Sequence, residues 1–169
     1  MSNKIKIMEV HTQQHEHTKP LHNHYRHLLI MTILSFIAMY VLMYAMVDVL
    51  ANVILNVNQF YMAGLMSMPM VIIELAVMAG MYKNKKLNAI IFAVSSIALI
   101  TFFFCIRQQT AVGDRQFLKS MIPHHAAAIL MVKEAKLSDP EIIKLGQEII
   151  ASQAAEIAEM KSKLKELKK

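Results

Sequence analysis

Two adjacent histidines lie between two methionines in the stretch Met121-Ile-Pro-His-His-Ala-Ala-Ala-Ile-Leu-Met131 of a chain that has only eight histidines. In a helix of about 3.6 residues per turn, four of these side chains flank one inward-facing stripe: Met121, His124, His125 and Met131. Thioether and imidazole groups suit Cu(I) and Ag(I), whereas hard ions require clusters of carboxylates. The spacing therefore predicts a soft-metal site, and a histidine network in the core is the alternative.

A second amphipathic stretch carries a polar patch within its apolar stripe, formed by Gln153, Glu156 and Met160. Burying an amide and a carboxylate is costly unless they are paired, and a His–Glu pair would satisfy both partners. We therefore expect the patch to face the histidines across a helical hairpin. The candidate metal ligands are His124, His125, Met121, Met131, Met160, Glu156 and Gln153. No Ser, Cys or Thr nucleophile accompanies the histidines, so we expect neither a catalytic residue nor enzyme activity.

The hairpin itself is predicted from helix start signals. Gly113-Asp114 is a break before a helix that extends to about Leu137. Ser138-Asp-Pro-Glu141 has the form of a capping box with proline in the first turn, and it begins a helix that extends from about Pro140 to about Leu167. Two helices alone bury too little apolar surface to be stable. A second copy of the chain or the membrane surface must therefore cover them.

The run Phe117–Met131, followed by Ser152-Gln-Ala-Ala-Glu-Ile-Ala-Glu-Met160, resembles the domain of unknown function 305 family over residues 114–168. The resemblance implies a ferritin-like bundle, an association with copper in the periplasm, and the same seven ligands. Ala127 stands where a glycine is usual, and Val132 and Gly146 stand where related membrane members often have cysteine, which leaves a Met/His site. Longer members have two hairpins, so the resemblance implies that this chain completes a four-helix bundle as a homodimer or higher homo-oligomer.

The composition predicts that the preceding part of the chain lies in a lipid bilayer. Hydrophobic residues make up 56% of the chain and charged residues 18%. A span needs about 20 apolar residues, and three runs are long enough: 28–50, 60–82 and 87–106. The net charge of +6 comes from basic residues that flank these runs, so we expect no nucleic-acid partner.

The distribution of lysine and arginine predicts the orientation. The N-terminal tail is basic, and the turn between the second and third spans is Lys83-Asn-Lys-Lys86, whereas residues 51–59 carry no charge. Positive loops stay on the cytoplasmic side. We therefore expect a multi-pass protein of the bacterial inner (cytoplasmic) membrane, with its N-terminus in the cytoplasm and its C-terminal domain in the periplasm.

The spans contain a carboxylate and many methionines. Glu74 lies deep in the second span, where an ionisable group is costly and marks a partner or a cavity. Methionines recur along one face of each of the first two spans, at Met39, Met43 and Met46 and at Met62, Met66 and Met70. A soft-metal pathway through an oligomeric transporter is one interpretation. Ordinary packing by a flexible side chain is the simpler one.

Together these patterns predict an all-α chain with three parts. Residues 1–27 form a disordered tail rich in histidine, residues 28–106 form a three-span membrane domain, and residues 107–169 form an extracytoplasmic hairpin. The expected function is the binding or sequestration of Cu(I) or Ag(I) in heavy-metal tolerance, without an organic cofactor. The alternatives are a membrane-anchored interaction module with a structural His/Glu/Gln network, and an oligomeric metal transporter.

Overall fold

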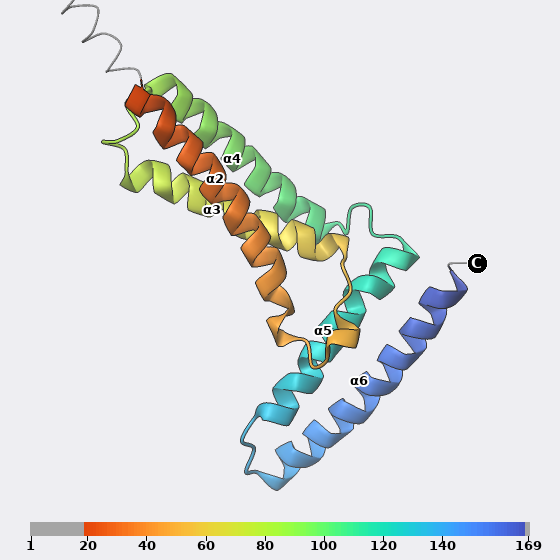
Figure 1. Cartoon of the computed structure of the whole chain (residues 1–169). Helices are drawn as coiled ribbons and strands as arrows, with labels where there is room; N and C mark the ends of the chain where they lie inside the picture. Colours follow the sequence, from red (N-terminus) through yellow and green to blue (C-terminus); the bar gives the residue numbers. More distant parts are fainter. Residues whose placement is uncertain (1–18, 168–169) are drawn as a thin grey trace, which may run out of the picture.

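The computed structural model describes residues 19–167, which contain helices and no strand (Figure 1). The all-α prediction is therefore confirmed for this part of the chain. The elements, in chain order, are α2 (Lys19–Leu42), the short 3-10 helices η1 (Met43–Met46) and η2 (Leu50–Asn52), α3 (Val57–Val77), α4 (Lys85–Arg107), α5 (Asp114–Glu134) and α6 (Pro140–Glu166).

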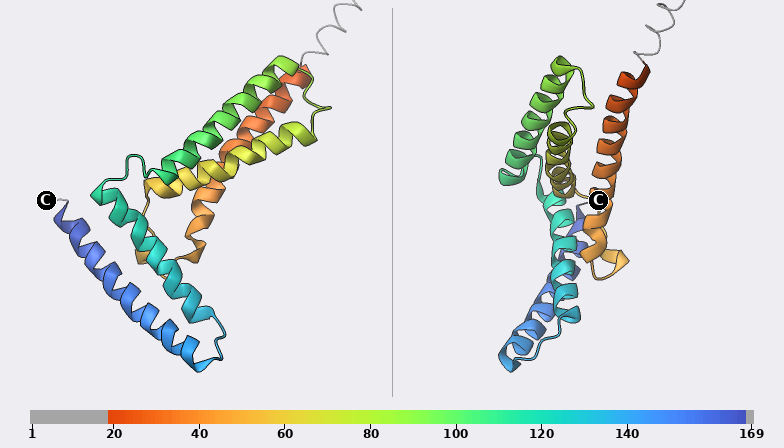
Figure 2. Two further views of the ribbon diagram at one scale, coloured as in Figure 1. Left: turned by 180° about the vertical axis from the view of Figure 1, so that it is seen from behind. Right: turned by 90° about the vertical axis from the view of Figure 1, so that its left-hand side faces the viewer.

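Three helices are long and apolar enough to cross a membrane, over His24–Met46, Val57–Val77 and Lys85–Arg107. They lie side by side, and α3, which packs against both α2 and α4, is the most buried of them (Figure 2). Side-chain caps fix two of their starts: Asn56 accepts a hydrogen bond from the Gln59 amide at 2.8 Å, and Asn84 accepts one from the Leu87 amide at 3.1 Å. These caps begin α3 and α4 slightly earlier than the apolar runs predicted.

The first membrane helix begins earlier than its apolar run. Residues 19–27 were predicted to be part of a disordered tail, but α2 starts at Lys19. Proline suits the first turn of a helix, as Pro20 does here, and extending an existing helix costs much less than nucleating one. The disorder prediction is therefore wrong for this segment, and its remaining residues, 1–18, lie outside the described part of the chain.

The same helix also ends earlier than predicted. The apolar run continues to Leu50, but α2 gives way to η1 at Met43, and Val47 has extended backbone. The Tyr44 hydroxyl donates to the Ile54 carbonyl at 2.9 Å, which closes the segment into a loop. We call residues 43–56, between α2 and α3, the docking loop.

The C-terminal hairpin packs α5 against α6 around a small apolar core, whose buried members are Leu118, Ile122, Ala126, Ile129, Ile157 and Met160. α6 begins at Pro140, as predicted, but its cap differs from the predicted capping box. Asp139, not Ser138, is the N-cap, and its carboxylate accepts from the amides of Glu141 and Ile142 at 2.8 and 3.1 Å. An Asp and a Ser cap equally well, so the sequence alone does not choose between neighbours.

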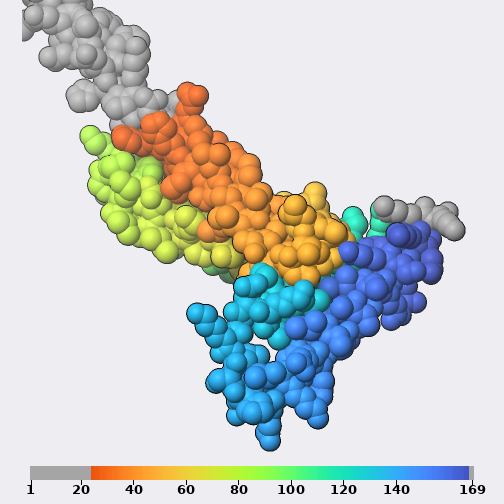
Figure 3. All heavy atoms as spheres, turned by 60° about the horizontal axis from the view of Figure 1, so that its bottom comes forward, coloured from red at the N-terminus to blue at the C-terminus, as the bar shows by residue number. Residues whose placement is uncertain are grey.

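The docking loop joins the membrane helices to the hairpin. Val47 and Ile54 pack against the hairpin core, and Lys161 of α6 donates to the Asn52 side chain at 2.5 Å. Figure 3 shows the loop, in orange to yellow, lying against both helices of the hairpin. The partner that the hairpin needs is thus supplied, on one face, by the chain's own membrane domain.

Glu74 has a partner at the opposite end of the membrane domain. The Tyr82 hydroxyl donates to the Glu74 carboxylate at 3.3 Å, and the rings of Tyr25 and Tyr82 lie 5.2 Å apart. Burial, and then the neighbouring Glu74 carboxylate, raise the pKa of the Tyr82 hydroxyl. Glu74, for which the sequence predicted a partner or a cavity, thus has a partner in the Tyr82 hydroxyl.

Candidate metal centre

His125 of α5 faces α6 and pairs with Glu156. Its Nε2 lies 2.7 Å from Glu156 Oε2, and its Nδ1 lies 2.9 Å from the Met121 carbonyl oxygen. Both partners are acceptors, so only the doubly protonated ring can donate to both at once. The predicted His–Glu pair is confirmed, and both nitrogens of this nearly buried imidazole are engaged by the protein.

Glu156 is half-exposed and is held by two donors. The Ser152 hydroxyl donates to Oε1 at 2.9 Å, while His125 contacts Oε2. The hydrogen bond from Ser152, followed by that from His125, lowers the pKa of the Glu156 carboxyl below its ordinary value, and partial burial opposes the shift. Ser152 was missed as part of this network, although its i, i+4 spacing from Glu156 was a usable signal.

His124 points to a different face of α5. Consecutive residues of a helix are about 100° apart, so His124 cannot share the environment of His125. It is exposed to a cavity of about 420 Å³ between α5, the docking loop and the start of α3. We call this space the junction cavity. Its lining comprises Met43, Met46, Val47, Asn56, Asn58, Gln59, Met62, Ser120, Met121, Pro123, His124, Ala127, Ala128 and Met131.

The structure therefore divides the seven sequence-predicted ligands. Three of them line the junction cavity: Met121, His124 and Met131. His125 and Glu156 form the pair between the helices, Met160 is buried in the hairpin core, and Gln153 is half-buried on α6. The sequence predicted that the ligands of α5 share one inward-facing stripe. In the structure they lie on two faces of α5, one packed against α6 and the other facing the membrane domain.

The candidate metal donors of the junction cavity are soft, uncharged groups. Among residues 19–167, no group of three or more His, Cys, Asp and Glu side chains is placed to hold a metal ion. The cavity lining instead combines one imidazole with five thioethers, and it includes no carboxylate. Such a set does not fit Zn²⁺, Mg²⁺ or Ca²⁺, and it does fit a soft monovalent ion.

Two features of the cavity were not predicted as part of this site. The sequence places Met43, Met46 and Met62 on the methionine-bearing faces of the first two spans, but it does not indicate that they lie near His124. A long-range contact between the docking loop and α5 brings them there, and helical periodicity carries no signal for such a contact. The uncharged polar lining, including Asn58 and Ser120, was also missed.

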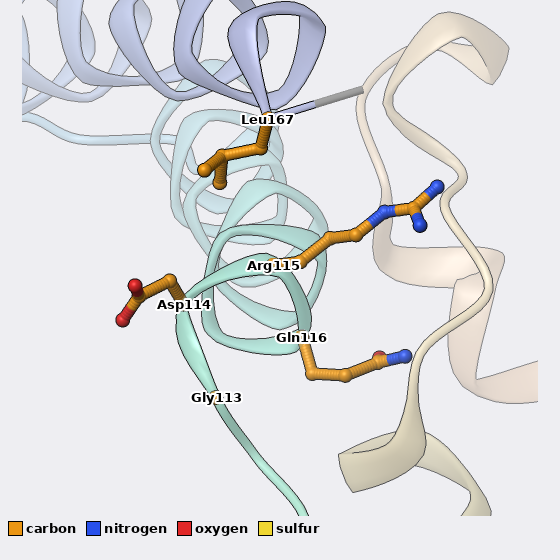
Figure 4. Close-up of a pocket in the computed structure, with 5 residues that line it drawn as sticks. All are labelled: Gly113, Asp114, Arg115, Gln116 and Leu167. Atoms are coloured by element: carbon orange, nitrogen blue, oxygen red, sulfur yellow. The ribbon is translucent and has the colours of Figure 1, made fainter. Parts of the chain in front are cut away.

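A second, smaller pocket lies at the open end of the hairpin, where the start of α5 faces Leu167. Its volume is about 340 Å³, and Gly113, Asp114, Arg115 and Gln116 complete its lining. The Asp114 and Arg115 side chains point in different directions (Figure 4). Gln116 is used structurally, because its side-chain oxygen accepts from the Val57 amide at 3.4 Å. None of the candidate ligands lines this pocket.

Comparison with known families assigns residues 66–164 to the domain of unknown function DUF305. The chain belongs to the DUF305 family. The match begins within α3, well before residue 114, so the family region includes part of the membrane domain as well as the hairpin. In this DUF305 protein, the family region thus holds Met121, His124 and Met131 but not the docking loop.

An uncharacterized protein of Acanthamoeba polyphaga mimivirus is 36% identical over 144 residues, which cover 83% of this chain and 93% of the relative. The similarity to this DUF305 chain thus extends over most of both proteins. No solved structure matches the chain.

Proposed function

We propose that this DUF305 protein is an integral membrane protein that binds Cu(I) or Ag(I) and sequesters these ions in heavy-metal tolerance. One observation carries the proposal: Met121, His124 and Met131 line the same cavity on one face of α5. Thioether and imidazole are uncharged, polarizable donors that favour soft monovalent ions over hard divalent ones. We refer to these three side chains as the hairpin donors.

His124 is the histidine best suited to bind a metal. Its imidazole makes no hydrogen bond to another residue of 19–167, whereas both nitrogens of His125 have protein partners. A metal ion bound by His125 would have to displace Glu156 or the Met121 carbonyl. We therefore assign metal binding to His124 and a structural role to the pair between His125 and Glu156.

The proposed orientation places the hairpin outside the cytoplasm of a bacterial cell. The Lys83-Asn-Lys-Lys86 turn lies at the end of the membrane domain that is remote from the hairpin (Figure 1), as the positive-inside rule requires. In this orientation the junction cavity lies at the outer end of the spans, where it can take up ions from the periplasm.

A homodimer is part of the proposal. The hairpin exposes large apolar side chains, among them Phe117, Ile142, Leu145 and Leu167. A second hairpin packed against them would complete the four-helix bundle expected of a ferritin-like fold. The alternative function, a membrane-anchored interaction module, is favoured by the pair between His125 and Glu156, because such a pair can fix helix register without any ligand.

The test is a Cu(I) titration of the full chain in detergent against a competing chelator. His11, His15, His17 and His22 are replaced by alanine throughout, so that the tail does not bind the ion. We expect His124→Ala and Met121→Leu to weaken binding by about tenfold or more, because loss of even an outer-shell partner costs roughly 10–100-fold. His27→Ala, an exposed histidine at the far end of α2, is the matched control. If all three variants bind like the parent, the interaction module is the better function.

A further inference from the structure

Three methionines of the membrane domain face the hairpin donors across the junction cavity. Met43 and Met46 belong to η1, at the end of the first membrane helix, and Met62 belongs to the second turn of α3. We call them the span methionines. They reach the cavity from two helices that the hairpin does not contain, so the lining is shared between two parts of the fold.

The docking loop holds the span methionines in this place. Tyr44 lies between Met43 and Met46 in the sequence, and its hydroxyl donates a hydrogen bond to the Ile54 carbonyl. Ile54 itself packs against the hairpin core. On the α3 side, Asn58 donates to the Ser120 hydroxyl of α5 at 3.3 Å. The two walls of the cavity are thus joined by packing and by hydrogen bonds that do not involve the thioethers.

Other methionines of the chain have different surroundings. Met66 and Met70 are exposed on α3 and line no part of the cavity. Met39 accepts a weak hydrogen bond from Ser67 at 3.7 Å, between α2 and α3. Ordinary packing explains these positions. By contrast, Met43, Met46 and Met62 line one cavity together with His124.

We propose that the soft-metal site is shared: the span methionines Met43, Met46 and Met62 supply thioether ligands that close the site over the hairpin donors. This inference rests on the proposed function and adds where the remaining ligands come from. The bound species is a monovalent soft ion, Cu(I) or Ag(I), because the shared lining offers thioether sulfur and one imidazole without any carboxylate. Binding thereby links the hairpin to the membrane domain.

Substitution of the span methionines tests the proposal in the full chain. The combined variant Met43→Leu, Met46→Leu, Met62→Leu keeps the side-chain volume, a change that cores tolerate well. We expect it to weaken Ag(I) and Cu(I) binding by at least about tenfold, with an unchanged melting temperature in the absence of metal. The matched control replaces three exposed methionines outside the cavity, Met66, Met70 and Met81, and should bind like the parent.

The outcomes separate this inference from the proposed function. Wild-type affinity in the span-methionine variant, together with weak binding by His124→Ala, would confine the site to the hairpin and overturn the shared site alone. Wild-type affinity in both variants would overturn both proposals.

A measurement on the unmutated protein keeps the test independent of folding defects. A methionine-selective oxaziridine label, read by mass spectrometry with and without Ag(I), reports which thioethers the ion covers. Ag(I) should protect Met43, Met46 and Met62, and leave Met66 and Met70 as reactive as before. Equal labelling of the span methionines with and without Ag(I) would contradict the shared site.

Discussion

At the scale of single residues, neighbouring histidines of α5 have different chemistry because they have different partners. His125 is enclosed by a carboxylate and a backbone carbonyl, whereas His124 opens onto a cavity with thioether walls. The pairing of a histidine with Glu156 was predicted from the cost of burying an unpaired carboxylate, but in the structure Glu156 is half-exposed and His125 is the buried partner. Which histidine would pair did not follow, because that choice depends on the angle at which α6 packs against α5.

The hydrogen bonds to Glu156 make a prediction about acid stability. Its folded-state pKa is lowered, so its contribution to stability is complete above its ordinary pKa of 4.5 and is lost as the pH falls through the lowered value. Glu156→Gln should therefore unfold at a lower temperature than wild type at neutral pH, and the gap should narrow in acid. The measurement is the melting temperature of both proteins from pH 7 to pH 3.

Ser152→Ala provides the graded control for this experiment. It removes the hydrogen bond that lowers the Glu156 pKa most while keeping the His125 contact. The loss of stability in acid should then be smaller than in wild type and be complete at a higher pH, because the lowered folded-state pKa moves back toward 4.5. If the difference in melting temperature between wild type and Glu156→Gln stays constant with pH, ionisation of Glu156 does not contribute to the stability of the fold.

At the scale of helices, the contact between α3 and α4 depends on a glycine. A Cβ atom added to Gly64 would lie 2.7 Å from Cδ2 of Phe102 and closer still to two other ring atoms. The ring is also flanked by Phe60 and Tyr61, so it has little room to move. Overpacking lowers the free energy of unfolding by about 1–3 kcal/mol. The better helix propensity of alanine offsets about 1 kcal/mol of this loss.

Gly64→Ala should therefore lower the free energy of unfolding by up to about 2 kcal/mol, seen as a lower melting temperature in detergent. Gly80→Ala is the control, because nothing lies within 4 Å of the added atom. In a Phe102→Leu background the Gly64 substitution should become neutral or stabilising. If it destabilises that background equally, the ring contact is not the cause.

The identity of the helices was predictable from the sequence, and so were the starts of α5 at Asp114 and of α6 at Pro140, but the ends of the membrane helices were not. Apolar runs of bilayer length and the 3.6-residue period gave the existence and order of five helices. The end of α2 lies before the end of its apolar run because Val47 and Ile54 pack on a distant hairpin instead of in lipid. The residue that caps α6 was not predictable either, because Ser138 and Asp139 are equally good caps and the structure uses Asp139.

At the scale of the whole molecule, the basic turn and the hairpin lie at opposite ends of the membrane domain (Figure 2). Single cysteines test the proposed orientation in a Cys105→Ser background. Lys144→Cys on α6 and Lys85→Cys at the turn both place the thiol at an exposed position. We expect an impermeant maleimide to label Lys144→Cys in intact spheroplasts, and Lys85→Cys after lysis alone. The reverse pattern would place the hairpin in the cytoplasm.

The candidate site was predictable in part at this scale. The chemistry of its donors could be deduced from Met121 and His124 alone. The contribution of Met43 and Met62 could not, because it depends on the fold that brings the first two spans against α5. The periodicity of α5 does not tell which of its faces packs against α6 and which faces the membrane domain. The contact with the docking loop and the start of α3 makes that difference.

The docking loop also fixes when the site can exist during biosynthesis. Met43 and Met46 leave the ribosome before the third span has been made, while His124 follows that span. In the proposed orientation, the cavity forms only after α5 has been translocated and has returned to the loop. A nascent or wrongly inserted chain therefore lacks the proposed set of six donors, and on the proposed function only correctly inserted protein would capture the ion.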